Sequence, residues 1–280
     1  MIALIGECVF DRVRWPDDRI VERLGGAPIY AGRALVGAAT AVVLTHGGSQ
    51  RLRDPLFGLG HEVIVGPPSG TTAFEVTLFG DGRWVEVIRS FGEPFVAEDV
   101  AGWMAPALAR CSTVVCGTQW RGDLPAETVA ALATRGHRIF LDGQGITRPR
   151  RLGPIRLEAE NITAFSGVQV LKLGEDEANV LIGGIDAARA RATGIPVVVV
   201  TLAERGAVVL AEGVATEVGV SPVEGLSDTV GAGDSFLALM AAAAEAGADP
   251  ITATQAACDG VAALLRQRRV GERAEVVVSR

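Results

Sequence analysis

The chain has 280 residues, and its 33 acidic residues outnumber its 26 basic ones, so the formal net charge is −7 at neutral pH. This balance argues against a general affinity for nucleic acid. Lys172 is the only lysine, so the Gly-Lys-Ser/Thr loop of Walker-type nucleotide-binding enzymes is excluded.

Short β-rich runs alternate with alanine-rich helical segments along the chain. After a first strand at 1–5, the predicted strands cover 41–45, 62–65, 113–116, 138–142, 168–172, 197–202 and 207–210. The predicted helices cover 29–36, 97–109, 126–135, 186–192, 234–246 and 251–267. The strands are apolar enough to be covered on both faces. We therefore expect one α/β domain over residues 1–280, a doubly wound and mostly parallel sheet flanked by helices, with ligands at the carboxyl ends of the strands.

One segment breaks this alternation. Residues 73–88 alternate apolar and polar side chains around Asp81-Gly82, which predicts a β-hairpin. Residues 8–15 also form an extended stretch. On its own, the alternating pattern fits an ordinary edge hairpin as well as a functional flap.

The cysteines and the N-terminal segment bear on the compartment. The sequence has four cysteines: Cys8, Cys111, Cys116 and Cys258. They form no Cys-x-x-Cys pair and no metal-ligand spacing with histidine, so we expect reduced core residues in a cytoplasmic protein. The chain opens as a strand without a basic region or cleavage site, and no apolar run reaches membrane-spanning length. We expect Arg148, Arg150 and Arg151 to lie in a solvated loop.

The most informative segment is the glycine-rich turn at 228–236, which runs into an alanine-rich helix. Gly231 and Gly233 permit backbone angles that bring successive N–H groups together, and the helix adds the positive end of its dipole. Asp234 lies at the helix start, beside this anion site. It is either a helix cap or the base that phosphate transfer to an alcohol requires beside the attacking hydroxyl.

This turn, Asp228-Thr229-Val230-Gly231-Ala232-Gly233-Asp234-Ser235-Phe236, resembles the C-terminal signature of the ribokinase-like (PfkB) carbohydrate and nucleoside kinases. The resemblance implies that Asp234 is the catalytic base and that the amides of Gly231, Ala232 and Gly233 form the anion hole. It implies that Asp228 helps to order a loop for a monovalent cation such as K⁺. ATP and Mg²⁺ are the implied cofactors.

The N-terminal part resembles the same family. Gly25-Gly26 precedes a small-residue helix, as the paired glycine of the family does, and Asp11 lies where relatives hold the hydroxyls of the acceptor. Tyr30 stands where many sugar kinases have asparagine, which favours a branch with an aromatic residue there. These residues are the implied acceptor site. Residues 8–16 and 71–92 would form the small β lid that closes over the acceptor and excludes water.

Two segments in the middle of the chain match the family less closely. Gln144, in Asp142-Gly143-Gln144, replaces the asparagine of sugar kinases and is a candidate for acceptor binding. Glu177 takes the place of a glutamate that helps to organise magnesium, although acids at a helix start also compensate the helix dipole. Lys172 would neutralise phosphate charge or pair with those acids.

Residues 201–206 resemble the nucleotide loop of the family. Thr201, Glu204 and Gly206 are the candidate contacts to the nucleotide, with Ala203 where glycine is commoner. As a bare strand-turn-strand connection, the segment would carry no function.

The sequence therefore predicts an ATP-dependent kinase that phosphorylates a hydroxyl of a small polyol, a cyclitol such as myo-inositol or a sugar. The alternatives are a nucleoside kinase of the same family and a non-catalytic sensor that binds a sugar or nucleotide. Tyr30 and Gln144 favour a cyclitol or a nucleoside over a hexose or ribose. A monomer and a homodimer both stay open, and neither nucleic acid nor a membrane is an expected partner.

Overall fold

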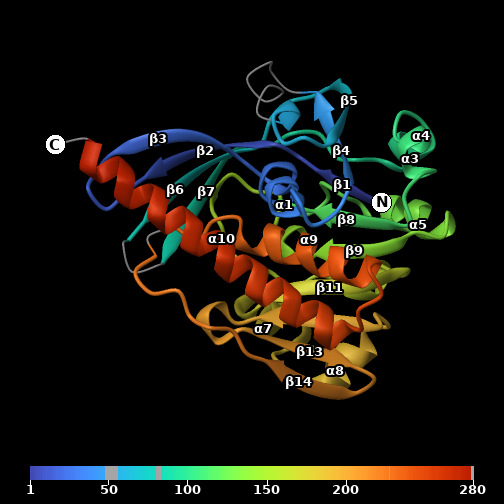
Figure 1. Ribbon diagram of the computed structural model, residues 1–280. Coiled ribbons are helices and arrows are strands. Elements are labelled where there is room, and N and C mark those ends of the chain that lie inside the picture. Colours follow the sequence, from blue (N-terminus) through green and yellow to red (C-terminus); the bar gives the residue numbers. More distant parts are fainter. Residues whose placement is uncertain (48–55, 80–82, 227, 279–280) are drawn as a thin grey trace.

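The main sheet of the protein is flanked by helices on both faces (Figure 1). The computed structural model describes residues 1–47, 56–79, 83–226 and 228–278. The sheet has nine strands in the order β14-β13-β12-β11-β9-β8-β1-β4-β5. They are β1 (Ile2–Gly6), β4 (Ala41–Gly47), β5 (Glu62–Pro68), β8 (Thr113–Gly117), β9 (Arg138–Asp142), β11 (Val168–Gly174), β12 (Val197–Thr201), β13 (Ala207–Ala211) and β14 (Val214–Val218). All pairs are parallel except β12 with β13 and β13 with β14, which confirms the predicted doubly wound, mostly parallel sheet.

Each face of the sheet carries its own apolar core. The helices are α1 (Ala27–Leu35), α3 (Ala97–Ala101), α4 (Ala105–Leu108), α5 (Ala126–Thr134), α6 (Gln144–Thr147), α7 (Glu175–Ile182), α8 (Ala187–Ala192), α9 (Ala232–Glu245) and α10 (Pro250–Val278). Ile2 and Leu4 of β1 pack in a core with α1, α9 and α10. Ala3 and Ile5 point the other way and pack with α3, α4, α5, α7 and α8. Because both faces are buried, central strands such as β1 are apolar along their whole length.

The helix predicted at 97–109 is wrong in one respect, because the structure divides it into α3 and α4. The first helix ends at Gly102, whose N–H donates to Glu98 O, and Pro106 opens the second. Glycine and proline both disfavour a helix interior, so the break falls between them. The last helix, α10, continues past the predicted end at 267. None of the helices in the described part of the chain combines the length and apolarity needed to cross a bilayer.

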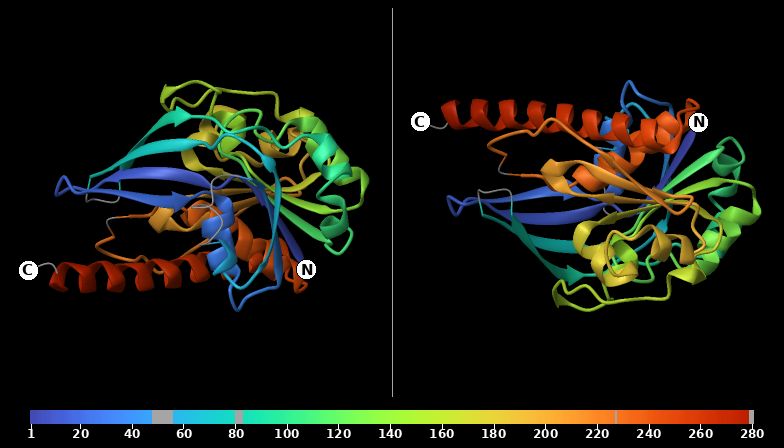
Figure 2. Two further views of the ribbon diagram at one scale, coloured as in Figure 1. Left: turned by 90° about the horizontal axis from the view of Figure 1, so that it is seen from above. Right: turned by 90° about the horizontal axis from the view of Figure 1, so that it is seen from below.

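A second sheet, the lid sheet, has five strands in the order β10-β7-β6-β2-β3. They are β2 (Val9–Arg14), β3 (Ile20–Gly25), β6 (Ala73–Leu78), β7 (Trp84–Ser90) and β10 (Gly153–Pro154). The antiparallel pairing of β6 with β7 confirms the predicted hairpin, although its Asp81-Gly82 turn lies outside the described residues. The sequence did not predict β3, whose apolar residues Ile20 and Val21 are both exposed. In Figure 2 the lid sheet extends from the core in the same direction as the end of α10.

Glu245, at the end of α9, ties three segments together at the amino ends of the strands. Its carboxylate accepts hydrogen bonds from Ser112 Oγ, from Thr113 Oγ1, from Arg138 Nη2 at 2.6 Å and from the N-terminal amine of Met1 at 3.3 Å. Burial alone would raise the pKa of Glu245, but these hydrogen bonds lower it to about 2. The ionised carboxylate therefore stabilises the folded state.

Replacing Glu245 by Gln is expected to lower the free energy of unfolding by about 1–3 kcal/mol, because polar partners lose their acceptor. The ordinary pKa of glutamate is about 4.3, so the stabilisation by Glu245 is fully present above that pH and is lost as the pH falls toward 2. Urea denaturation should therefore show a larger difference from the unsubstituted protein at pH 7 than at pH 3. Glu217→Gln, at an exposed position, is the control, and equal unfolding of the two variants would contradict the prediction.

Candidate active site

A cavity of about 1050 Å³ opens at the carboxyl edge of the main sheet, between that sheet, the lid sheet and α10. Most of the predicted site residues line it: Asp11, Gly26, Tyr30, Gln144, Lys172, Glu177, Thr201, Glu204, Gly206, Gly231, Ala232, Gly233 and Asp234. Gly25 and Asp228 are not part of its wall. The fold thus gathers residues from distant parts of the sequence at the edge where open α/β sheets bind ligands.

The glycine-rich turn leads into the N-terminus of α9. Gly231 has φ of +79°, which favours glycine, and a Cβ there would lie 2.1 Å from the Tyr30 ring. Within the described residues, no protein group accepts a hydrogen bond from the N–H of Gly233 or Asp234. Free N–H groups at the start of a helix attract anions. The turn therefore presents the donors that an anion hole requires.

Asp234 lies in the first turn of α9, and its carboxylate accepts no hydrogen bond from a described protein group. It therefore does not cap the helix. Burial raises the pKa of Asp234 to about 7, with a further rise from Asp142, against the lowering effect of Lys172 and Arg148. An uncommitted carboxylate with this pKa can take up a proton at neutral pH.

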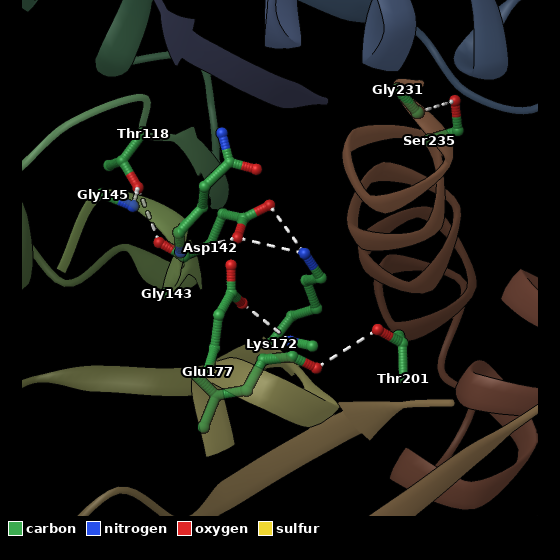
Figure 3. A network of polar contacts seen from close by, with 12 residues as sticks. Thr118, Asp142, Gly143, Gly145, Lys172, Glu177, Thr201, Gly231 and Ser235 are labelled. Carbon is green, nitrogen blue, oxygen red and sulfur yellow. Dashed lines mark hydrogen bonds and ion pairs between the residues drawn. The ribbon is translucent and has the colours of Figure 1, made fainter. Parts of the chain in front are cut away.

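Lys172 extends from β11 toward Asp142 at the end of β9 (Figure 3). Its Nζ lies 3.1 Å from each carboxylate oxygen of Asp142, and both side chains are buried. A Cβ on Gly233 would lie 2.8 Å from the same Nζ, so the ammonium is adjacent to the anion hole. Burial alone would lower the pKa of Lys172, but Asp142, Glu177 and Asp234 raise it above its ordinary value. Lys172 is therefore a fixed positive charge beside the turn.

Glu177 lies in the first turn of α7. Its Oε2 accepts a hydrogen bond from Gly174 N at 2.7 Å, so the carboxylate caps its own helix (Figure 3). This contact accounts for the acid at the helix start, as the dipole interpretation expects. Glu177 also lines the cavity, so a role toward magnesium stays a prediction.

The lid contributes Asp11, whose Oδ2 lies 3.5 Å from Tyr30 Oη and 3.8 Å from Arg23 Nε. A Cβ on Gly25 would lie 2.3 Å from Asp11 Oδ2, so the glycine makes room for the carboxylate. Burial raises the pKa of Asp11 to about 7, although Arg23 lowers it. Tyr30 is buried, and its ring packs between Asp11 and Gly231. Tyr30 therefore fixes the spacing between the lid and the glycine-rich turn.

Sequence reasoning missed three polar residues of the cavity wall. Glu86 of β7 pairs with Arg148, at 2.7 Å between Oε2 and Nη1, and Gln119 Oε1 accepts from Gln144 Nε2 at 3.2 Å. Arg148 is 7% exposed, so its assignment to a solvated loop is wrong. No local signal marks the pair, because its members lie 62 residues apart and meet only through the lid. These residues add hydrogen-bonding groups to the cavity wall that Asp234 also lines.

The segment predicted to hold the nucleotide connects β12 to β13 by a short 3₁₀ turn, Ala203–Arg205. Gly206 has φ of +91°, and a Cβ there would lie 2.1 Å from Val218 O. Ala203 adopts φ of +52°, a conformation that favours glycine, which is the residue commoner at this position of the family. Thr201 Oγ1 donates to Leu173 O at 3.2 Å (Figure 3). Beyond this turn, the cavity wall becomes apolar over Val220, Val223, Leu226, Val261, Ala262 and Leu265.

Asp228 is buried beneath the turn. Its carboxylate accepts hydrogen bonds from the guanidinium of Arg23 and from Val230 N at 2.9 Å, and Arg268 Nη1 lies 3.7 Å away. Arg23 comes from lid strand β3, so Asp228 links the lid to the glycine-rich turn. A role of Asp228 toward a monovalent cation stays a prediction.

The chain is similar to kinases in sequence and in fold. The model of the pfkB family carbohydrate kinase matches residues 154–273, whereas no curated protein sequence matches the chain. The sulfate complex of a pyrophosphate-dependent kinase in the ribokinase family is 20% identical, with a TM-score of 0.80 over 95% of each chain. A pyrophosphate-dependent kinase of that family, complexed with a pyrophosphate analogue and myo-inositol, is 20% identical, with a TM-score of 0.78 over 92% of each chain. The Burkholderia thailandensis nucleoside kinase in complex with inosine is 17% identical, with a TM-score of 0.71 over 94% of this chain and 90% of the other.

These solved structures share the ribokinase-like fold with nearly the whole chain. The matched family model spans the segment from β10 into α10, which contains the turn at 203–205 and the glycine-rich turn before α9. Sequence and fold thus agree: residues 154–273 match the family model of the pfkB carbohydrate kinases, and the chain has the ribokinase-like fold.

Proposed function

We propose that the protein transfers the terminal phosphoryl group of ATP to a hydroxyl of a small polyol, a cyclitol such as myo-inositol or a sugar. The observation that carries this proposal is the uncommitted Asp234 carboxylate beside the free amides of Gly233 and Asp234. Phosphoryl transfer needs a base at the attacking hydroxyl and donors at the moving group. The first turn of α9 supplies both.

Asp234 takes the proton of the acceptor hydroxyl as the hydroxyl oxygen attacks the terminal phosphorus of ATP, and ADP leaves. The amides of the glycine-rich turn and the ammonium of Lys172 hold the transferring group, and the lid keeps water out. No group of three or more His, Cys, Asp or Glu in the described residues is arranged to hold a metal ion. Mg²⁺ that arrives with the donor phosphates and keeps several waters would fit this arrangement, and Glu177 is the carboxylate proposed to help hold it. When bound, the ion neutralises charge on the donor phosphates.

The acceptor pocket favours a neutral ligand with several hydroxyls. The cavity that Asp234 lines also has acceptors and donors of hydrogen bonds on Asp11, Glu86, Arg148, Gln119 and Gln144. A hydroxyl both donates and accepts, so a polyol can satisfy such a mixed wall. The complex of a pyrophosphate-dependent kinase with myo-inositol supports the cyclitol.

A nucleoside is the second candidate acceptor. Trp84 of the lid is only partly buried, lines the cavity and offers apolar surface to a base. The nucleoside kinase in complex with inosine shares the fold. Tyr30 does not add a stacking surface, because its ring is buried against Gly231.

The donor is ATP or pyrophosphate, since the two ribokinase-family kinases compared above are described as pyrophosphate-dependent. The apolar wall beyond the 203–205 turn favours ATP, because an adenine ring buries apolar surface there and pyrophosphate has none to bury.

The test is an acceptor-dependent assay of ADP release from ATP, or of phosphate release from pyrophosphate, with Mg²⁺ present. Acceptors are myo-inositol, ribose, fructose, adenosine and cytidine, and Asp234→Asn is assayed in parallel. A signal that depends on a polyol and ATP and that the substitution abolishes supports the proposal. Ligand binding by thermal shift without turnover on either donor contradicts it and favours a sensor. Turnover on pyrophosphate alone would keep the kinase and correct the donor.

Replacing Asp11 by Asn is expected to raise the KM for the acceptor by about 10- to 100-fold, because a hydrogen bond to a charged group is lost. The KM for the donor should stay within about twofold, since Asp11 lies on the lid and away from the 203–205 turn. Steady-state kinetics with each substrate varied in turn makes the measurement. Asp17→Asn, an exposed aspartate of the same lid hairpin, is the control. A change confined to the donor KM would show that the acceptor pocket is misassigned.

A further inference from the structure

We propose that Glu7 is a positioning residue, which holds the lid sheet against the main sheet so that Asp11 and Asp234 line one cavity. This inference rests on the proposed function, since it concerns how the acceptor site is assembled. Glu7 directly follows β1 and precedes β2, so it lies where the chain first leaves the main sheet for the lid. It is 4% exposed, and no basic residue in the described part of the chain forms an ion pair with it, which is rare for a buried glutamate.

The carboxylate of Glu7 joins the other chain segments that enter and leave the lid. Its Oε1 accepts from Thr72 N and its Oε2 from Thr72 Oγ1, each at 2.6 Å, and Thr72 directly precedes β6. Gly92, just after β7, packs so closely that a Cβ there would lie 2.1 Å from Glu7 Oε1. Gly26, between β3 and α1, packs on the Glu7 carbonyl, with 2.2 Å from an added Cβ to the oxygen. Four connections between lid and main sheet therefore meet at Glu7, two of them on its carboxylate and one on its main-chain carbonyl, in addition to its own.

Thr72 extends this contact. Its hydroxyl donates to Glu7 and accepts from Gly92 N at 2.9 Å and from Trp120 Nε1 at 3.1 Å, and its carbonyl accepts from Phe10 N at 3.1 Å. The hydroxyl has one proton and two lone pairs, so its capacity is filled. The proton of the Thr72 hydroxyl is donated to Glu7 Oε2, and the Thr72 N–H is donated to Glu7 Oε1. Both carboxylate oxygens of Glu7 therefore have to act as acceptors.

The same cluster continues into the acceptor pocket. Trp120 N donates at 3.3 Å to the buried carboxylate of Asp123, which also accepts from Gln119 N. Gln119 lines the cavity and pairs with Gln144. On the other side, Asp11 lies four residues after Glu7 on β2. Glu7 thus connects the lid and main-sheet halves of the acceptor wall without itself lining the cavity.

Glu7→Gln separates acceptor capacity from side-chain size. The amide keeps the shape, but it turns one acceptor into a donor that faces the N–H or the filled hydroxyl of Thr72. We expect the KM for the acceptor to rise by about 10-fold or more, with the donor KM unchanged within about twofold. Amide hydrogen exchange should become faster in β2 and β6 and stay unchanged in β8 and β9.

Thr72→Val and Thr72→Ser form a second pair of variants, which carries the test even where Glu7→Gln does not fold. Valine removes the hydroxyl, so Thr72→Val should also raise the acceptor KM and speed amide exchange in β2 and β6. Serine keeps the hydroxyl, so Thr72→Ser should have a KM and exchange rates close to those of the unsubstituted protein. Glu22→Gln, an exposed glutamate of β3, is the control. Unchanged exchange in the lid, or faster exchange of lid and main sheet alike, would overturn the proposal. Turnover of the unsubstituted protein tests the proposed function, and exchange tests Glu7 independently of it.

Discussion

Asp234→Asn is expected to lower kcat by about 10²- to 10⁴-fold, the range for the loss of a positioned general base. Asparagine has the same shape but cannot take the hydroxyl proton. The free N–H groups of the turn and the Lys172 ammonium stay in place, so donor and acceptor should still bind. Acceptor-dependent product release measures the rate, and thermal shift measures binding. The control is Asp259→Asn, at an exposed position of α10. Full activity of the Asp234 variant would show that Asp234 is not the general base.

The pH dependence of kcat tests the same role. Because the pKa of Asp234 is raised to about 7, the base is ionised above that pH and becomes protonated below it. We expect kcat to fall about tenfold per pH unit on the acid side, and the residual activity of Asp234→Asn to lack this decrease. Saturating acceptor is needed, because the pKa of Asp11 is also raised to about 7 and would weaken acceptor binding in the same range. A decrease that persists in the variant would belong to another group.

Local patterns predicted eight of the nine strands of the main sheet, and they missed only the mostly exposed edge strand β14. Strands such as β1 and β12 are continuous apolar runs, and each core uses alternate residues of them. The glycine-rich turn before α9 was equally accessible, because its backbone demands act within a few residues. Gly231, for example, needs a positive φ and has no room for a Cβ. Most of the predicted site residues lie around one cavity.

Contacts between distant segments were not predictable in the same way. The pair of Glu86 with Arg148 and the link of Arg23 to Asp228 depend on how the lid sheet is seated on the main sheet. The lid itself was only partly visible, because β3 carries exposed apolar residues and alternates poorly. Glu7 gave no signal at all, since its partner Thr72 lies 65 residues away. Ion pairs and hydrogen bonds of this kind depend on which segments lie close together in the fold, and a short sequence pattern does not predict that.

Lys172→Met is expected to lower both stability and rate. Removing one partner of a buried ion pair leaves the Asp142 carboxylate uncompensated, at a cost of about 3–5 kcal/mol in the free energy of unfolding. The anion hole also loses a positive charge, so kcat should fall by about 10²- to 10³-fold. Lys172 lowers the pKa of Asp234, so the acid-side decrease of kcat should move to higher pH in this variant. Chemical denaturation and the pH profile measure the two effects separately.

The double variant Asp142→Asn with Lys172→Met separates the structural role of Lys172 from its role toward phosphate. The double variant also lacks the Asp142 charge that Lys172 compensates, so most of the stability lost with that ion pair should return. The rate should stay low, because the positive charge beside Gly233 is still missing. Arg205→Gln is the control, since it breaks the exposed pair with Glu175 and should change stability by less than about 1 kcal/mol. Recovery of rate together with stability would mean that Lys172 acts only by supporting the fold, whereas recovery of stability alone assigns its charge to the transferring phosphoryl group.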